Sequence, residues 1–259
     1  MNSRLQNKRV LITGASAGFG EACAHAFAGA GANLELWARR KDRLDAVRKD
    51  VLARHKVDIG IRDVDVRDRD TVRAAVAELA AAGKHIDVLV NNAGLASGLD
   101  PIHEGDYEDW DAMIDTNLKG LLNVTREVLP DMVKRNSGHV INIGSVAGYI
   151  AYPRGNVYGA TKFAVRGLTE AMNIDMLGTK VRISSVDPGA AETEFSTVRF
   201  HGDEARAKKV YDGFQPLTSE DVADAVLYVA GTPEHVNITK LVLMPTAQRT
   251  PFHIHREKS

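Results

Sequence analysis

The sequence predicts a single domain of the α/β class, in which a doubly wound parallel sheet of about seven strands has helices on both faces. Three observations predict it. Short β-branched runs alternate along the 259 residues with helix-type segments, which are long enough to cross over between parallel strands. The run IDVLVN is nearly continuously apolar, as in a strand covered on both faces. No Pro-, Gly- or Ser-rich linker interrupts the chain, so we expect one domain over residues 1–259.

In the first half of the chain, the run RVLITG (9–14) is β-branched and stops at a glycine, as expected for a strand that turns into a helix. The alanine-rich GEACAHAFAGAG (20–31) after it has helical composition. NLELWARR (33–40) returns to the strand pattern, and KDRLDAVRKDVLARH (41–55) has the charged exposed face of an amphipathic helix. A further strand, helix and strand are expected at residues 57–66, 70–83 and 86–94.

The second half opens with a long segment of helical pattern, from about residue 107 to residue 135, before the strand run HVINIGS (139–145). GNVYGATKFAVRGL (155–168) has the apolar spacing of a helix, and VRISSVDPG (181–189) is again a strand. A helix at 219–231 and a strand at 240–245 complete the alternation. Two stretches lie outside it, an irregular insertion at about 190–216, expected to be a substrate loop or lid, and a tail at about 246–259.

Composition and charge exclude several functional classes. The chain is 44% hydrophobic and 26% charged with a formal net charge of -1, so it has no basic field for nucleic acid or an anionic membrane. The single cysteine, Cys23, has no internal partner for a disulfide, which fits a reducing compartment. The apolar run near the N-terminus is too short for a signal peptide, and no later run has the length of a membrane span. We therefore expect a soluble cytoplasmic protein.

The stretch TGASAGFG places Gly14, Gly18 and Gly20 between the first predicted strand and the first predicted helix. Free N–H groups at a helix N-terminus bind phosphate, and glycines let the backbone come close to a pyrophosphate. By itself such a stretch is equally consistent with a tight turn. Its position after the first strand of an alternating chain favours a dinucleotide-binding Rossmann fold, with Ser16 and Phe19 also in contact with the coenzyme.

The end of the second predicted strand indicates which dinucleotide is bound. Arg39 and Arg40 stand in WARRKDR, where an NAD-binding fold usually has an acid for the ribose hydroxyls. The alternative is that both are solvated residues at a helix start. Cations are unfavourable at a helix N-terminus unless an anion binds nearby, so we expect NADP(H) rather than NAD(H).

With these motifs in place, the chain resembles the short-chain dehydrogenase/reductase family along essentially its whole length. The matching motifs occur in the family's order: TGASAGFG, the DV of Asp65, the NNAG of Asn91, the Asn117 in DTNLKG, Ser145, YGATK at 158–162, and DPG at 187–189. The resemblance implies a catalytic set of Ser145, Tyr158 and Lys162, completed by Asn117, which would hold a water that relays protons. A Tyr/Lys pair alone is more often a core tyrosine beside a solvated lysine.

The chemistry of the catalytic set agrees with this reading. Reduction of a carbonyl by hydride needs a proton donor at the oxygen, and oxidation of the alcohol needs a base there. A phenol with its ordinary pKa near 10 is a poor base at neutral pH. Tyr158 and Lys162 are four residues apart on a predicted helix, so the ammonium and the positive nicotinamide are expected to lower the pKa of the phenol. Ser145 is expected to hydrogen-bond the carbonyl oxygen.

The resemblance also implies further coenzyme contacts. Those expected at the adenosine are Asp65 with the adenine amine, the Val66 N–H with the same ring, and Asn91 beneath the ribose, together with Ala93 and Gly94. Asp65 and Asn91 are alternatively a strand-end cap and a turn residue. Those expected at the nicotinamide are Lys162 on its ribose, Pro188 and Gly189 as a wall, and Thr193 on the carboxamide.

A narrower resemblance indicates the substrate class. NNAGLASGLDP, YPRGNVYGATK, ETEFSTVRFHGD and PEHVNITKLVLMPTAQ are similar to the branch that contains 3-hydroxy acid dehydrogenases, serine 3-dehydrogenases and semialdehyde reductases, including sulfoacetaldehyde reductases. This implies a small anionic hydroxy acid or its aldehyde as substrate. A guanidinium suits such an anion, and Arg154 and Arg199 are the candidates, although both are alternatively surface residues. Arg154 stands where this branch often has glycine.

Three expectations concern the tail, assembly and alternative functions. His253 and His255 lack a partner cluster, so we expect no metal. By resemblance, the tail reaches a neighbouring subunit's active site through Phe252, within a homotetramer. The alternatives to a hydroxy acid dehydrogenase are a reductase of another carbonyl class and a coenzyme-sensing protein without turnover. A sensor has no reason to keep all four catalytic residues.

Overall fold

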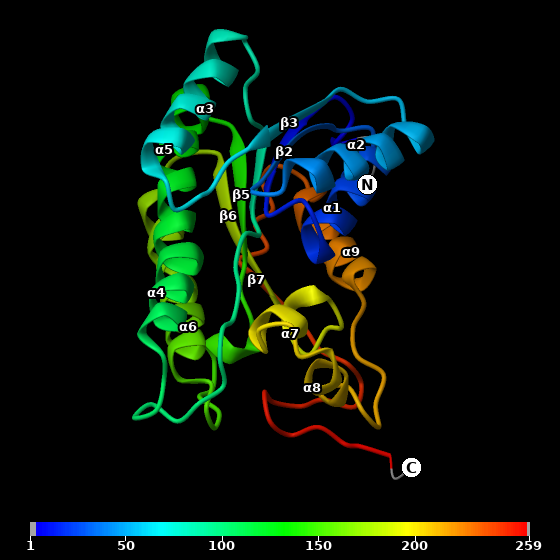
Figure 1. Ribbon diagram of the computed structural model, residues 1–259. Helices are drawn as coiled ribbons and strands as arrows, with labels where there is room; N and C mark the ends of the chain where they lie inside the picture. Colours follow the sequence, from blue (N-terminus) through cyan, green and yellow to red (C-terminus); the bar gives the residue numbers. More distant parts are fainter. Residues whose placement is uncertain (1–3, 258–259) are drawn as a thin grey trace.

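The computed structural model describes residues 4–257, which form one α/β unit around a central sheet (Figure 1). The strands are β1 (Arg9–Thr13), β2 (Asn33–Ala38), β3 (Ile59–Asp63), β4 (Val88–Asn91), β5 (Gly138–Ile143), β6 (Val181–Pro188) and β7 (Lys240–Leu243). The longer helices are α1 (Gly18–Gly29), α2 (Lys41–Arg54), α3 (Arg69–Ala81), α5 (Leu121–Arg135), α6 (Asn156–Asp175) and α9 (Ser219–Ala230). The expected fold class and the seven-stranded parallel sheet are confirmed.

The strand order determines where a crevice forms along the sheet. The order is β3-β2-β1-β4-β5-β6-β7, and every neighbouring pair is parallel. After β1 the chain winds outward to β3 and then returns to the other side of β1 with β4. The loops that follow β1 and β4 therefore diverge, and a crevice opens at the carboxyl ends of these strands.

Helices cover both faces of the sheet, and each layer encloses its own core (Figure 1). On one face, α1, α2 and α9 pack around a core that contains Ile12, Phe27 and Val226. On the other, α3, α5 and α6 flank a core that contains Trp37 and Leu89. Alternate residues of the same strand thus serve opposite cores, because side chains alternate across a sheet.

The long helical segment of the second half is interrupted at its centre. It consists of α4 (Tyr107–Ile114), a π-helical turn η2 (Asp115–Gly120) and α5. The predicted continuous helix from 107 to 135 misses this interruption, because the apolar pattern continues through it. A π-helical turn rotates one side chain out of register and is common at functional sites. Here it contains the motif residue Asn117.

The insertion between β6 and α9 holds two short helices, α7 (Glu194–Arg199) and α8 (Glu204–Lys209). Thr193 caps α7 by accepting a hydrogen bond from the Phe195 N–H, and Asp203 caps α8 in the same way from Arg206. Helix α9 begins with a reciprocal capping box between Thr218 and Asp221. These caps fix where the insertion departs from and returns to the regular layers.

Candidate functional site

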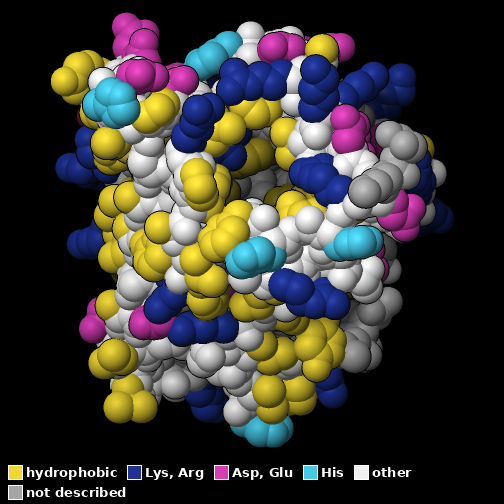
Figure 2. Space-filling view, turned by 90° about the horizontal axis from the view of Figure 1, so that it is seen from below, with side chains coloured by type: hydrophobic (Ala, Val, Ile, Leu, Met, Phe, Trp, Pro, Cys, Tyr) yellow, Lys and Arg dark blue, Asp and Glu magenta, His cyan; other side chains and the backbone are white. Residues whose placement is uncertain are grey.

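A cleft with a cavity of about 460 Å³ opens at the carboxyl ends of the strands. Its walls come from the loops after each of the strands β1 to β6, together with α6, α7 and the C-terminal tail. Figure 2 looks onto this end of the molecule and shows a hollow with hydrophobic side chains in its walls and Lys and Arg side chains near its rim. The cleft is thus apolar inside with cationic groups at its mouth, which suits an anionic ligand.

The glycine loop after β1 has the geometry of a phosphate cradle. Gly14 has φ +66°, and a Cβ there would lie 2.9 Å from the Ala93 Cα. A Cβ on Gly20 would lie 2.4 Å from the Gly14 carbonyl oxygen, so neither position accepts a side chain. At the start of α1 no side chain caps the helix, which leaves its N–H groups directed at the cleft. This close backbone packing fits a dinucleotide pyrophosphate.

The end of the cleft that is expected to hold the adenosine is bordered by Ser16, Arg39, Arg40, Asp65 and Val66. Arg40 donates to the Ser16 Oγ at 3.2 Å, so a guanidinium and a hydroxyl already meet at this corner. The Arg67 guanidinium grips the Asp65 carboxylate at 2.6 Å and holds its pKa below the usual range. Asp65 is thus engaged within the chain, while Val66 forms part of the wall.

Asn91 is engaged within the protein. Its side-chain amide points into the protein and donates to Thr125 Oγ1 and Asn142 Oδ1, both at 2.9 Å. It is buried at the end of β4 and is not among the residues that line the cleft. The strand's alternation thus turns this side chain toward the α5 face and away from the cleft. The expected position of Asn91 beneath the ribose stays a prediction. The neighbouring Asn92, Ala93 and Gly94 line the cleft instead.

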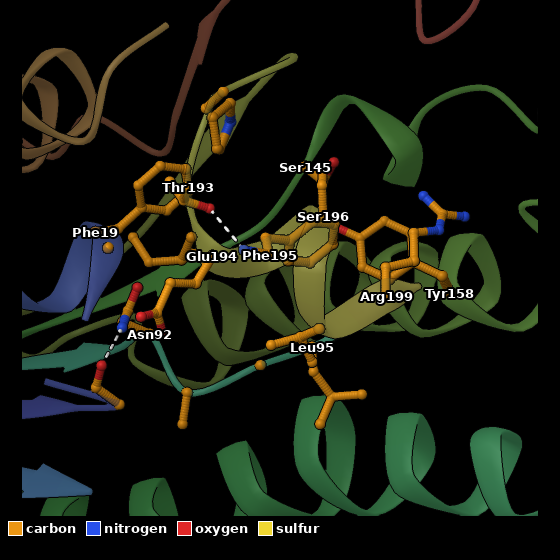
Figure 3. Close-up of a pocket in the computed structure, with 18 of the residues that line it drawn as sticks. Phe19, Asn92, Leu95, Ser145, Tyr158, Thr193, Glu194, Phe195, Ser196 and Arg199 are labelled. Atoms are coloured by element: carbon orange, nitrogen blue, oxygen red, sulfur yellow. Dashed lines mark hydrogen bonds between the residues drawn. The ribbon is translucent and has the colours of Figure 1, made fainter. Parts of the chain in front are cut away.

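Three side chains of the expected catalytic set meet at the far end of the cleft. Ser145 follows β5, and Tyr158 and Lys162 lie one turn apart on α6. Lys162 Nζ donates to the Ile143 carbonyl at 2.9 Å and lies 5.9 Å from the centre of the Tyr158 ring. All three line the cavity, and Figure 3 shows Tyr158 and Ser145 at the same end of it. The ammonium is therefore beside the phenol but held by a backbone carbonyl.

The pKa of Tyr158 is governed by burial in the structure. Burial raises the pKa of this phenol above its ordinary value, while the Ser145 hydroxyl and the Arg199 guanidinium act in the opposite direction. Burial also lowers the pKa of Lys162 to about 8. Loss of hydration thus outweighs the neighbouring charges at both groups. The fall in the pKa of Tyr158 expected from Lys162 together with the positive nicotinamide stays a prediction.

Asn117 is held by the interruption in the helix. Its Oδ1 accepts from the Leu95 N–H and its Nδ2 donates to the Leu95 carbonyl, both at 2.8 Å, with a further bond to Thr161 at 3.1 Å. These bonds join η2 to the loop after β4 and to α6, on which Lys162 lies. The side chain is buried, so its visible role is to fix the floor of the site. Its expected water contact stays a prediction.

The nicotinamide end is bordered by Pro188 and Gly189 from the end of β6 and by Thr193 at the start of α7. Gly189 leaves space for the tail, because a Cβ there would lie 2.3 Å from the Gln248 side chain. Gln248 accepts from the Ala190 N–H at 2.7 Å. Thr193 already accepts from the Phe195 N–H at 3.1 Å, a bond visible in Figure 3. Its hydroxyl hydrogen is left for another acceptor.

Arg199 is the expected substrate residue that the structure brings into the catalytic end. Its guanidinium carbon lies 5.7 Å from the centre of the Tyr158 ring, and its Nη2 donates to the Tyr152 hydroxyl at 3.2 Å. Its Nε donates to the Gly98 carbonyl at 3.2 Å. Tyr152 and the Gly98 carbonyl thus hold the Arg199 guanidinium next to the Tyr158 phenol. Tyr152, Tyr158 and Arg199 all line the cleft.

The other two expected substrate residues lie outside the cleft of this chain. Arg154 is exposed and borders a small side cavity that shares Tyr158 and Arg199 with the main cleft. Its φ of +62° lies in the left-handed region that favours glycine. Phe252 is 49% exposed and packs on His253, whereas Pro251 and Ile254 of the tail line the cleft. Contact of Phe252 with another subunit stays a prediction.

Several residues of the cleft were not singled out from the sequence. Tyr152 begins the run YPRGNVYGATK, but nothing in that run assigned it a role. Glu194 and Arg43 form an ion pair at 2.5 Å that closes the adenosine corner of the cleft, and only the fold brings them together. Arg43 had a weak signal, because it lies one helical turn beyond Arg39 and Arg40 and would share their face.

The structure also bears on metal sites and on membrane-spanning helices. Within residues 4–257 no group of three or more His, Cys, Asp or Glu side chains is placed to hold a metal ion. None of the helices in the same range combines the length and the apolar character needed to cross a membrane.

The family follows from comparison with known proteins. The family model for short chain dehydrogenases matches residues 8–204, which span the glycine loop, the catalytic residues and α7. The chain belongs to the short-chain dehydrogenase family, as its motifs predicted.

Individual relatives are similar over nearly their whole length. An NADP-dependent 3-hydroxy acid dehydrogenase, YdfG of Salmonella typhi, is 49% identical over 95% of this chain and 99% of its own. Sulfoacetaldehyde reductase 2 of Chromohalobacter salexigens is 45% identical over 96% of this chain and 98% of its own. The closed form of a serine dehydrogenase complexed with NADP+ is 46% identical with a TM-score of 0.90, over 96% of this chain and 100% of that one. The names of these relatives agree with the expected dehydrogenase activity and with NADP(H) as the expected coenzyme.

Proposed function

We propose that the protein is an NADP(H)-dependent dehydrogenase that interconverts a small anionic 3-hydroxy acid, such as serine or 3-hydroxypropionate, with its semialdehyde or keto form. The observation that carries this proposal is the placement of Arg199 beside Tyr158 at the closed end of the cleft. One group there exchanges a proton and the other binds an anion, so a substrate needs an oxygen and a negative charge a few atoms apart.

Ser145 and Tyr158 handle the reacting oxygen. In reduction, Tyr158 donates its phenolic proton to the carbonyl oxygen as the C=O double bond becomes a single bond, and Ser145 orients that oxygen. NADPH, when bound, supplies the hydride that forms the new C–H bond and becomes NADP+. In oxidation the same oxygen returns its proton to Tyr158. Lys162 stabilises the phenolate left after donation, because its charge lies one helical turn away.

Arg39, Arg40 and Ser16 support the choice of NADP(H). Both guanidinium groups line the adenosine corner, and Arg40 already bonds the hydroxyl of Ser16. A ribose phosphate placed there exchanges water for charge-assisted hydrogen bonds. The glycine loop holds the pyrophosphate through backbone N–H groups.

The test is consumption of NADPH with a panel of small carbonyl compounds, and its production with the corresponding alcohols. We expect turnover of malonic semialdehyde or L-serine with wild type, and a loss of at least about 1,000-fold in Tyr158→Phe, since the proton donor is removed. NADPH binding, measured by fluorescence, should be nearly unchanged in that variant. Substantial turnover by Tyr158→Phe would contradict the assignment of the proton donor.

A sulfonate substrate is the second candidate, favoured by the relative named sulfoacetaldehyde reductase and by the second cation, Arg154, on the side cavity next to Tyr158. Comparison of kcat/KM for sulfoacetaldehyde and malonic semialdehyde decides between them.

A coenzyme-sensing protein without turnover is the alternative of another class. Binding of NADPH without turnover of any member of the panel would favour it.

A further inference from the structure

A buried carboxyl group lies near the backbone segment that holds the catalytic lysine and has no part in the chemistry described so far. Asp187 is the penultimate residue of β6, immediately before Pro188 of the cleft wall, and it is only 2% exposed. A carboxylate at such a position is costly unless donors or a cation compensate for its lost hydration. Its surroundings therefore indicate what keeps it there.

Two hydroxyl groups hold this carboxylate. Ser185 Oγ donates to Oδ1 at 2.6 Å, and Tyr149 Oη donates to Oδ2 at 2.6 Å. Gly144 makes the approach possible, because a Cβ there would lie 1.8 Å from Oδ1. The carboxylate thus lies against the backbone that follows Ile143, the residue whose carbonyl accepts from Lys162 Nζ at 2.9 Å.

We propose that Asp187 is a positioning residue that keeps Lys162 charged inside the protein and thereby sustains the proton exchange at Tyr158. This inference rests on the proposed function. Lys162 is 8% exposed, and a buried ammonium tends to lose its proton unless a negative charge faces it. Tyr149 and Ser185 keep Asp187 ionised by donating to it, and Asp187 in turn stabilises the ammonium that faces Tyr158.

The directions of the pKa shifts agree with this arrangement. Burial lowers the pKa of Lys162 to about 8, and Asp187 opposes that fall. Burial raises the pKa of Asp187, while Ser185, Tyr149, Lys162 and Lys240 oppose that rise. The other charged or titratable groups around the pair are Tyr158, Arg166 and Glu170 on α6, Lys240 on β7, Tyr149 after Ser145, and Arg199 on α7.

The decisive measurement is the titration of Lys162 by NMR of its side-chain nitrogen in the coenzyme-free protein, with the signal assigned through Lys162→Met. We expect a pKa of about 8 in wild type and a fall of at least about one unit in Asp187→Asn, which removes the charge but keeps the shape. Tyr149→Phe is the matched control, because it removes one hydrogen bond and keeps the charge. It should move the Lys162 titration by less than half as much.

The pH profile of carbonyl reduction gives the second readout. In Asp187→Asn, the alkaline fall in kcat should begin at lower pH by about the same shift, because Lys162 loses its proton earlier. An unchanged Lys162 titration in Asp187→Asn, or equal shifts in both variants with equal losses of Tm, would overturn the proposal. If wild type turns over no carbonyl compound, the proposed function fails, while the titration still decides the role of Asp187.

Discussion

At the scale of the residue, Arg199 and Arg154 form a natural pair for comparison. Both were expected to bind an anion, but only Arg199 has its guanidinium fixed by Tyr152 and Gly98 and lies in the cleft. A preorganised guanidinium loses less freedom when it binds a carboxylate than an exposed one does. Arg199 is therefore the residue on which substrate affinity should depend.

We expect Arg199→Ala to raise the KM for the anionic substrate by about 10- to 100-fold, the effect of losing hydrogen bonds to a charged group. Arg154→Ala, at an exposed position, serves as the control and should change KM little for a carboxylate substrate. Steady-state kinetics with malonic semialdehyde measure both. For an uncharged aldehyde of the same length, the KM should not depend on Arg199. An equal rise in KM for both aldehydes would show that Arg199 shapes the site rather than binding the anion.

Some residue roles followed from the sequence and others did not. Ser145, Tyr158 and Lys162 were singled out through their resemblance to the motifs of the family, and the structure brings their side chains to one cavity. The direction of the Asn91 side chain was not predictable, because a motif gives the position of a residue but not the face to which its strand turns it. The effect of burial on the pKa of Tyr158 was not predictable either, because burial is set by parts of the chain far from α6.

At the scale of the element, α7 connects both ends of the site. Its first residue, Glu194, accepts from Arg43 at 2.5 Å and from Arg40 at 3.3 Å, and its last residue, Arg199, lies beside Tyr158. The Glu194 ion pairs hold this helix against the start of α2, across the mouth of the adenosine corner. The start of α7 is thus part of the wall that a ligand in that corner would contact.

We expect Glu194→Gln to increase the dissociation rate of NADPH by about 2- to 10-fold, because two half-exposed ion pairs are lost and each is worth up to about 1 kcal/mol. Stopped-flow fluorescence measures this rate. High salt should increase the wild-type rate toward that of the variant, since it screens exposed pairs. Tighter binding in Glu194→Gln would instead mean that Glu194 competes with the coenzyme phosphate for the arginines.

The elements themselves differ in how far the sequence predicted them. The strands and helices of the regular layers were found because a buried strand and an amphipathic helix each impose a period on the apolar residues. The π-helical turn at 115–120 was not, since its extra residue leaves that pattern almost unchanged. The short helices of the insertion depend on caps such as Thr193 and on contacts with the rest of the cleft, so local sequence alone gave only an irregular loop.

At the scale of the whole molecule, the sheet ends at β7, whose outer edge is unpaired within residues 4–257. Open edges bind other strands unless charge or a covering element protects them. Here Val242 on β7 is 45% exposed, so an exposed apolar side chain lies at the free edge. This edge is a suitable interface for a second copy related by a two-fold axis, within the expected homotetramer.

We expect wild type to have four times the mass of one chain by light scattering after gel filtration, and Val242→Lys to have twice that mass. The charge is placed at the free edge of β7, so only an interface at β7 should be lost while a second interface still joins two chains. Leu177→Lys, at an 88% exposed apolar position beyond α6, is the matched control and should leave the mass unchanged. A monomeric wild type would contradict the tetramer, and a Val242→Lys protein of unchanged mass would place the interface away from β7.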